Sequence, residues 1–389
     1  MAALSLSMMT LGIIGFSLHL LLIKVKTAPY LAPLIVALLS LAAISSGALV
    51  FSAIPSLTYY YIAAIPPTFF ILAPSLWLYS QALTSHLPWH FRQKYFIHYL
   101  PGFFALIVTV LILLLPDQAK HAIFFSNKEV DPGYTLFVVV SLFVAVVLWL
   151  TQSSVYLYKI VRCIILYNKQ LNQVFAENKS KTLTWLNFLT YLIALAWIWS
   201  VLALLSDDSR APFLLNEEIG MMLTLLVAWV LAYHGLQQQP GFMKLYNNIS
   251  EPLNVVIQEE SKNKYQRSAL GDEQSRRIAN KLKQALYEEQ LYLDPDLTLY
   301  KLANHLGVSA NYLSQTLNQT INMSFFEYVN AARIEAAKTK LLNKEDSVLN
   351  IAMGVGFNAR SSFYKAFKAC TGVTPSEFQK VNSAKAGQL

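Results

Sequence analysis

Long apolar runs fill the first 236 residues of the chain, and each run is long enough to cross a lipid bilayer. A transmembrane α-helix needs about 20 consecutive apolar residues. We expect seven such helices, at residues 4–23, 30–54, 59–83, 96–115, 134–157, 183–205 and 219–236. Pro66, Pro67 and Pro74 should bend the third helix and free backbone carbonyls, because proline has no N–H to donate. Such a bend either shapes a pocket or is only an irregularity of packing.

In the last part of the chain, apolar residues recur at the spacing of short amphipathic helices. One such pattern occurs twice, with an offset of 49 to 50 residues. Gly307 and Gly356 hold equivalent places, where a tight turn between two helices needs the positive φ that glycine adopts without steric cost. An apolar pair at i, i+4 follows each glycine and should pin a second helix to the core. These pairs are Leu313 with Leu317, and Phe363 with Phe367.

Capping signals delimit the helices of both copies. Asn322 and Gly372 tolerate the left-handed backbone that ends a helix. After them, Ser324 with Glu327 and Thr374 with Glu377 have the spacing of capping boxes that open new helices. One long helix at residues 325–342 should join the two copies. A further amphipathic helix should precede them, running from about residue 272 to residue 289 with a periodic apolar face.

This tandem resembles the DNA-binding domain of AraC-type transcriptional regulators. The matching residues are Leu302-Ala303-x-x-Leu306-Gly307-Val308-Ser309, Ala332-Arg333-Ile334-x-x-Ala337, Val355-Gly356-Phe357, and residues 362–368 and 372–378. A single helix-turn-helix is a weak signal because αα-hairpins are common, whereas so many matches in order are specific. The resemblance implies double-stranded promoter DNA as the partner, with RNA polymerase as a further candidate.

The second helix of each copy carries the candidate DNA-reading residues. An α-helix fits the major groove, and polar side chains on its outer face read base edges. In the first copy the face opposite the apolar pair offers Asn311, Ser314, Gln315 and Asn318. In the second copy it offers Arg360, Ser361, Tyr364, Lys365 and Lys368. These positions carry base and phosphate contacts in AraC-type regulators, and the alternative is that both faces are simply solvated.

The side chains on these faces suggest separate roles. Arg360 suits guanine, Gln315 and Asn311 suit adenine, and Lys365 and Lys368 suit phosphates. Most soluble members of the family carry Arg and Lys where Gln315 and Asn318 stand here, so the first recognition helix has no cation. The sugar-binding domain of arabinose-type members is absent, and the resemblance therefore predicts no effector.

Composition supports a membrane part followed by a soluble part. The chain is 55% hydrophobic and 13% charged, whereas a soluble domain carries roughly 25% charged residues. Up to Leu236 it holds twelve Lys/Arg and eight Asp/Glu, and the remainder holds eighteen and fourteen. We expect an all-α protein with a seven-helix transmembrane bundle at residues 1–236, a linker at 237–271 and an AraC-type domain at 272–389, named the head below.

Basic residues are divided unequally between the two sets of loops. Alternate connections carry nine Lys/Arg on one side and three on the other, and the positive-inside rule places the richer set in the cytoplasm. The first run has no basic residue before it, unlike a signal peptide. We therefore expect a multi-pass protein of the bacterial cytoplasmic membrane, with its N-terminus outside and its head in the cytoplasm beside DNA.

The apolar runs suggest no catalysis. They hold almost no acidic residues, whereas pumps and ion-coupled transporters usually place ionisable groups along their path. Cys163 and Cys370 form no zinc or disulfide motif, and the three histidines of one loop, His86, His90 and His98, lack the carboxylate or thiolate of a typical metal site. We expect no enzyme activity, cofactor or metal. The rival interpretations are a membrane enzyme or transporter with an accessory head, and a passive anchor.

The charge of the head suggests that it works as a homodimer. Residues 298–380 carry nine Lys/Arg and five Asp/Glu, a net charge of +4. This is modest for a DNA-binding domain, because phosphate neutralisation supplies most non-specific affinity. A bundle that senses a signal or sets dimerisation would raise the effective concentration of two tethered heads. The effector itself is not identified by the sequence.

Overall fold

The computed structural model describes residues 2–125, 133–177, 181–205, 217–243, 271–343 and 345–386. Within these residues every element is a helix, apart from one isolated bridge between Phe175 and Thr298, which confirms the all-α prediction. The chain forms two compact units. Unit 1 comprises Met1–Ile165 and Leu183–Asn247, and unit 2 comprises Leu166–Thr182 and Asn248–Leu389. Most of the expected linker, residues 244–270, lies outside the described residues.

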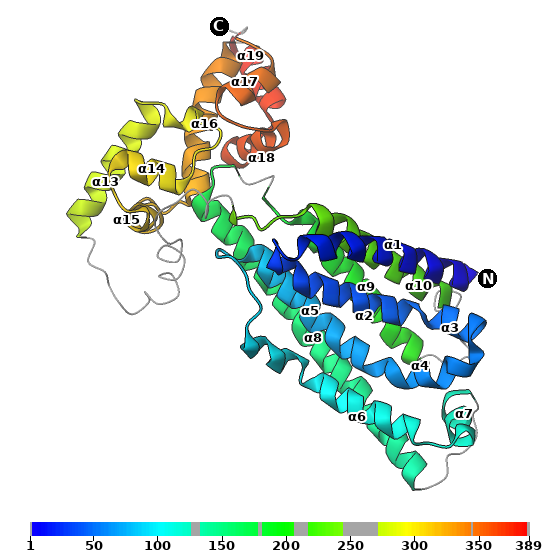
Figure 1. Ribbon diagram of the computed structural model, residues 1–389. Helices are drawn as coiled ribbons and strands as arrows, with labels where there is room; N and C mark the ends of the chain where they lie inside the picture. Colours follow the sequence, from blue (N-terminus) through cyan, green and yellow to red (C-terminus); the bar gives the residue numbers. More distant parts are fainter. Residues whose placement is uncertain are drawn as a thin grey trace. The chain divides into compact units, whose positions relative to one another are not determined.

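Unit 1 is a bundle of long apolar helices that lie side by side (Figure 1). Helix α1 packs against α10 and α2, α2 packs against α5, and α10 packs against α9. The helices are α1 (Ala2–Lys24), α2 (Ala32–Ser45), α3 (Gly47–Ala53), α4 (Thr58–Ala64), α5 (Pro66–Thr84), α6 (Pro101–Leu113), α7 (Asp117–Phe125), α8 (Tyr134–Val174), α9 (Thr184–Leu205) and α10 (Glu217–Gln237), with short 3-10 turns at Pro29–Leu31, Pro55–Leu57 and Gln93–Tyr99.

The described helices account for all seven apolar runs. Five spans are long and apolar enough to cross a membrane, and the count reaches seven when each of two bent helix pairs is taken as one span. The bends are 51° between Pro55–Ala64 and Pro66–Thr84, and 48° between Gln93–Tyr99 and Pro101–Leu113. The predicted proline bend in the third run is confirmed. Inside α5, Pro74 leaves the Phe70 carbonyl without its helical donor, and Gln152 Nε2 donates to that carbonyl at 3.2 Å.

Helix α8 corrects one expected boundary. The fifth apolar run ends at residue 157 and a charged loop was expected after it, but the helix continues to Val174. The reason is a buried stripe at helical spacing that continues through the charged residues: Tyr156, Ile160, Ile164, Tyr167, Leu171 and Val174. Lys159, Arg162 and Lys169 therefore lie on a helix and not in a loop. Residues from Leu166 onward belong to unit 2.

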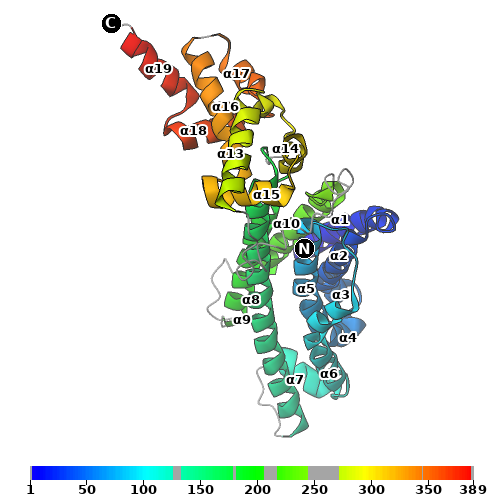
Figure 2. The same cartoon turned by 90° about the vertical axis from the view of Figure 1, so that its left-hand side faces the viewer.

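Unit 2 holds the head, in which the long helix α16 (Phe325–Leu342) lies between two groups of short helices (Figure 1, and Figure 2 from the side). Its length matches the prediction. The first group contains α13 (Asp272–Tyr287), the turn η5 (Leu291–Leu293), α14 (Leu299–Leu306), α15 (Ala310–Gln315) and a π-helical turn η6 (Thr316–Ile321), and the second contains α17 (Val348–Gly354), α18 (Arg360–Thr371) and α19 (Pro375–Ala386).

The predicted turns and caps of the head are confirmed. Gly307, Gly356, Gly372 and Asn322 all have positive φ, at 66°, 94°, 80° and 58°. Ser324 and Glu327 form a complete capping box at the start of α16. The Thr374 and Glu377 pair does the same for α19, with the Thr374 N–H donating to the Glu377 carboxylate at 2.8 Å and the Glu377 N–H donating to Thr374 Oγ1 at 3.3 Å. Local sequence therefore predicted these four turns and both capping boxes of the head.

Candidate DNA-binding surface

Helix α18 presents the more accessible of the two candidate DNA-binding faces of the head. Phe363, Phe367 and Ala366 are buried in the core formed with α16 and α17, so the opposite side of the helix faces outward. Arg360, Ser361, Lys365 and Lys368 are exposed, and Tyr364 is half-buried. The five residues expected on this helix therefore lie together on its accessible side.

Tyr364 holds the Arg360 guanidinium in place. The guanidinium carbon lies 5.0 Å from the centre of the Tyr364 ring, and Arg360 Nη2 donates to Tyr364 Oη at 3.1 Å. Hydrogen bonds from Ser376 and from Arg360 lower the pKa of Tyr364 below its ordinary value. A guanidinium stacked on a ring keeps its planar fork oriented, and this geometry suits bidentate pairing with guanine.

Several cations of the head lie in ion pairs, unlike the three cations of α18. Lys301, Lys338 and Lys340 lie 3.0, 2.6 and 3.7 Å from carboxylate oxygens of Asp294, Glu335 and Glu345, which offsets their charge. Among the ion pairs of the described residues, none involves Arg360, Lys365 or Lys368. Phosphate contacts are therefore expected first at the second recognition helix.

Arg333 belongs to the core and not to the surface charge of the head. Its side chain is 0% exposed. Nε donates to the Tyr292 carbonyl and Nη2 to the Asp294 carbonyl, both at 2.8 Å, so Arg333 ties α16 to the turn before α14. Burial lowers the pKa of Arg333 to about 10, against the opposing effect of the Glu177 and Asp294 carboxylates. The net charge of +4 counted from the sequence thus overstates the charge available to DNA.

The first recognition helix is much less accessible than the sequence pattern suggested. Asn311, Gln315 and Asn318 are half-buried, and Ser314 is only 8% exposed. The π-helical turn from Thr316 rotates the residues that follow it, because each π turn holds an additional residue. Exposed side chains on this stretch instead include Tyr312, Gln319 and Thr320, which the sequence analysis did not select. The sequence contains no signal for that rotation.

Residues 171–177, named the docking segment here, cover part of this helix within unit 2. Gln173 and Asn318 exchange two amide hydrogen bonds, both at 3.2 Å. Asn318 Nδ2 also donates to Ser314 Oγ at 3.3 Å. Asn318, a predicted DNA-reading residue of the first copy, is therefore hydrogen-bonded through both its amide nitrogen and its amide oxygen. Ser314, a second such residue, is hydrogen-bonded to Asn318.

The docking segment also contacts the rest of the head. Phe175 bridges Thr298, and the Ala176 N–H donates to the Leu297 carbonyl at 3.4 Å. Buried Asn330 of α16 donates to the Ala176 carbonyl at 3.1 Å. These contacts fix the segment against the start of α14 and the middle of α16.

Glu177 brings a carboxylate to the second recognition helix. Ser362 Oγ donates to Glu177 Oε1 at 2.9 Å, in the first turn of α18, and Glu177 is 8% exposed. The docking segment thus touches both helix-turn-helix copies. This contact was missed by the sequence analysis because residues 171–177 and the head are far apart in the chain.

No metal or cofactor site emerges from the described residues. In the part of the chain that the structure describes, no three His, Cys, Asp or Glu side chains gather closely enough to hold a metal ion. His86 packs against Phe242, with ring centres 4.1 Å apart, and His98 Nδ1 hydrogen-bonds Tyr156 Oη at 2.8 Å. His86 therefore takes part in aromatic packing, and His98 takes part in a hydrogen bond.

Comparison with known proteins places the head among transcriptional regulators. Residues 302–380 match the family described as "Helix-turn-helix domain". Over 90 residues the chain is 31% identical to an uncharacterized HTH-type transcriptional regulator of Staphylococcus aureus (strain COL), covering 23% of this chain and 12% of that protein. Over 92 residues it is 28% identical to the melibiose operon regulatory protein of Escherichia coli (strain K12), covering 24% of this chain and 30% of that protein.

A solved structure, the C-terminal domain of AraT, a response regulator from Geobacillus stearothermophilus, is 31% identical with a TM-score of 0.25, and the match covers 29% of this chain and 88% of that one. The chain spans less than a third of each of the two curated relatives. Their similarity lies in the head, which is an AraC-type helix-turn-helix domain. It follows helices apolar enough to span a membrane.

Proposed function

We propose that the protein is a membrane-bound, sequence-specific DNA-binding transcriptional regulator without enzyme activity. The observation that carries the proposal is the exposed cationic face of α18, in which Tyr364 orients Arg360 beside Lys365 and Lys368. The named function of the matched relatives, transcriptional regulation, supports it. Apolar helices of transmembrane length in the same chain support a location in the membrane.

The orientation follows from the distribution of basic residues. We place the N-terminus outside and the head in the cytoplasm of a bacterium, in reach of promoter DNA and RNA polymerase. The support is the excess of Lys/Arg at one set of ends of the apolar runs, three of them on the part of α8 beyond residue 157. Of these residues, Lys128, Lys179 and Arg210 lie outside the described residues. The bundle then senses a signal or sets the spacing of two heads in a homodimer.

The modest surface charge of the head favours a dimer over a single head. Arg333 is buried and three lysines are paired with carboxylates, so one head neutralises few phosphates. Two heads tethered to one membrane dimer share an effective concentration that reaches millimolar for short linkers. Dimerisation in the membrane would therefore control occupancy of a promoter without any contact between bundle and DNA.

The test begins with genome-wide DNA occupancy of the intact protein, read beside its neighbouring genes. On the promoter so identified, Arg360→Ala should lose about 1–3 kcal/mol of binding free energy and relax specificity at one base pair. Lys368→Ala should weaken all sequences alike, because a phosphate contact carries no sequence information. Equal losses on specific and random DNA for both variants would show that Arg360 is only a phosphate contact. An absence of any occupied site would contradict the proposed function.

A further inference from the structure

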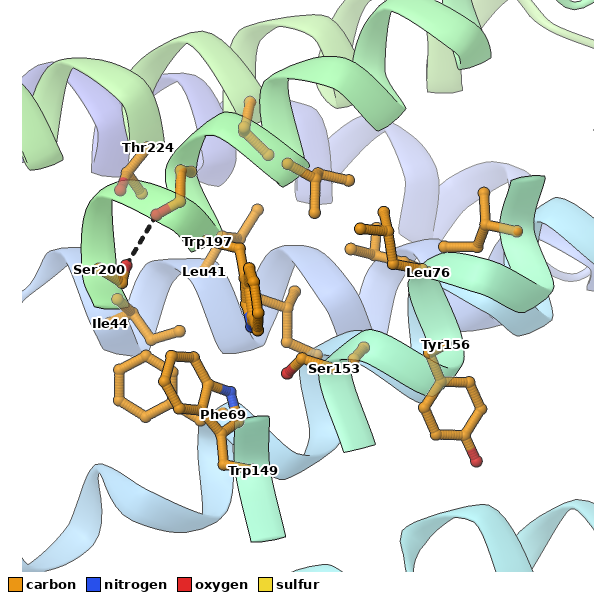
Figure 3. A pocket seen from close by; sticks show the side chains of 17 residues that line it. Leu41, Ile44, Phe69, Leu76, Trp149, Ser153, Tyr156, Trp197, Ser200 and Thr224 are labelled. Atoms are coloured by element: carbon orange, nitrogen blue, oxygen red, sulfur yellow. Dashed lines mark hydrogen bonds between the residues drawn. The ribbon is translucent and has the colours of Figure 1, made fainter. Parts of the chain in front are cut away.

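A cavity of about 170 Å³ lies inside unit 1, between α2, α5, α8, α9 and α10 (Figure 3). Its walls include Leu41, Leu76, Trp149 and Trp197, and no charged side chain lines it. Part of the wall is the segment of α5 on both sides of Pro74. An apolar cavity of about 150 Å³ is large enough to hold benzene. This space therefore fits a single ring with a small substituent.

Among the described residues, one fully buried polar atom of this wall has no hydrogen-bond partner. Trp197 Nε1 is buried and, among the described residues, no acceptor lies within hydrogen-bond distance. Figure 3 shows the Trp197 indole in the middle of the lining side chains. By contrast, the Ser200 and Thr224 hydroxyls donate to carbonyls of their own helices, at 2.8 and 2.9 Å. A buried N–H without an acceptor is costly, and an acyl chain of a lipid offers no acceptor to satisfy it.

We propose that this cavity is the binding site for a neutral, lipid-soluble effector consisting of one ring and one hydrogen-bond acceptor, which accepts from Trp197 Nε1. A charged effector would lose its hydration without gaining an ion pair. The proposal rests on the proposed sensing role of the bundle. It assigns the signal to a site inside the membrane unit and not to the head.

The experiment uses the full chain in phosphatidylcholine nanodiscs and two matched probes observed by fluorine NMR. The probe 4-fluoroacetophenone carries a carbonyl acceptor, and 4-fluoroethylbenzene has nearly the same shape without it. The first should bind about fivefold more tightly, as expected for one neutral hydrogen bond. Trp197→Phe keeps an aromatic side chain but removes the indole N–H, and should abolish this preference while retaining 4-fluoroethylbenzene binding. Ala196→Leu should fill the cavity and abolish binding of both probes.

Equal affinity for the two probes in the unmodified protein, or probe binding that Ala196→Leu leaves intact, would overturn the proposal. Promoter binding measured in the same nanodiscs without probe separates this failure from failure of the proposed function. A protein that binds its promoter and ignores the probes is a DNA-binding regulator whose bundle has no such site.

The docking segment carries a second, independent inference. DNA presents a negative charge about every 1.7 Å of its axis, and Glu177 places a carboxylate against the first turn of α18. Asn318 cannot read a base edge while its amide is bonded to Gln173. We infer that residues 171–177 are an autoinhibitory segment, and that DNA and the segment compete for the two recognition helices.

A disulfide lock tests this competition in the full-length protein. Bridged residues of antiparallel strands have Cα atoms about 4.5–5.5 Å apart, within the range that a disulfide needs. Phe175→Cys with Thr298→Cys, in a background with Cys163→Ser and Cys370→Ser, should cross-link on oxidation. The oxidised protein should bind promoter DNA at least about tenfold more weakly than the reduced protein, and Thr298→Cys alone should show no redox effect. Equal binding by a fully cross-linked sample would overturn the inference.

A charge-matched pair provides a second test that needs no cross-link. Glu177→Gln should raise promoter affinity severalfold, because it removes the carboxylate that Ser362 binds. Glu288→Gln changes the net charge equally at an exposed position of the head and should have a smaller effect. Equal effects of the two substitutions would refute a specific role for the docking segment. If neither the oxidised nor the reduced protein binds the promoter although the disulfide forms, the proposed function is wrong. The docked position of residues 171–177 is then still supported.

Discussion

Replacing Gly356 with alanine should destabilise the head far more than the same change at Gly307, although the two glycines hold equivalent places in the two copies. Both have positive φ, at 94° and 66°. At Gly307 an added Cβ meets nothing within 4 Å. At Gly356 it would lie 2.5 Å from the Tyr292 carbonyl oxygen and 3.1 Å from Arg333 Nε. The difference between the two sites is therefore steric.

The expected magnitudes follow from these neighbours. A left-handed alanine costs about 1–2 kcal/mol, and the reduced entropy of the unfolded chain returns about 0.4–1 kcal/mol. Gly307→Ala should thus cost about 1 kcal/mol. Gly356→Ala adds overpacking of about 1–3 kcal/mol and displaces the hydrogen bond that charged Arg333 donates to Tyr292, so we expect a total of about 3–5 kcal/mol. A domain of this size has only about 5–15 kcal/mol in all.

Urea unfolding followed by circular dichroism measures both values on the fragment from Lys262 to Leu389, which we expect to fold. The slope of the unfolding free energy against urea should be similar for the two variants, so that their midpoints can be compared directly. Two variants that agree within about 0.5 kcal/mol would refute the reasoning, because the backbone conformation alone would then explain both costs.

The other predictions concern the core, the topology and the role of the membrane. Phe367→Ala should cost about 3–5 kcal/mol, because Phe367 is 0% exposed; a head as stable as the unmodified one would show that the assigned core face of α18 is wrong. Topology reporters should signal the cytoplasm after Ser85, Asn178 and Gly271 and the outside after Ser56, Asn127 and Ser209, and an outside signal after Gly271 would exclude DNA binding by the head. The monomeric fragment from Lys262 to Leu389 should bind promoter DNA poorly at fixed salt, and fusion to a dimerising coiled coil should restore much of the affinity. If the bare fragment matches the intact protein, the bundle is not needed for dimerisation.

The sequence by itself determined the features that depend on neighbouring residues. The lengths of the apolar runs predicted the helices of unit 1. Capping boxes and left-handed residues predicted several ends of the head's helices, including the start of α16. These signals act over a few residues, because a cap or a turn satisfies backbone groups within its own segment. The exposed face of α18 followed from the same local period, since Phe363 and Phe367 alone set which side is buried.

Tertiary structure decided the features that depend on distant partners. Ser314 and Asn318 have the spacing of an outward face, yet contacts with α13 and Gln173 cover that part of the helix. Arg333 counts as a surface cation in the sequence, and only the carbonyls of Tyr292 and Asp294 explain why it is buried. Gly307 and Gly356 hold equivalent positions in the two copies, but of the two only Gly356 has another segment of the chain where a Cβ would lie. A local pattern predicts which side chains can face away from their own helix's core contacts. Whether such a side chain is buried depends on which distant segment of the chain packs against it.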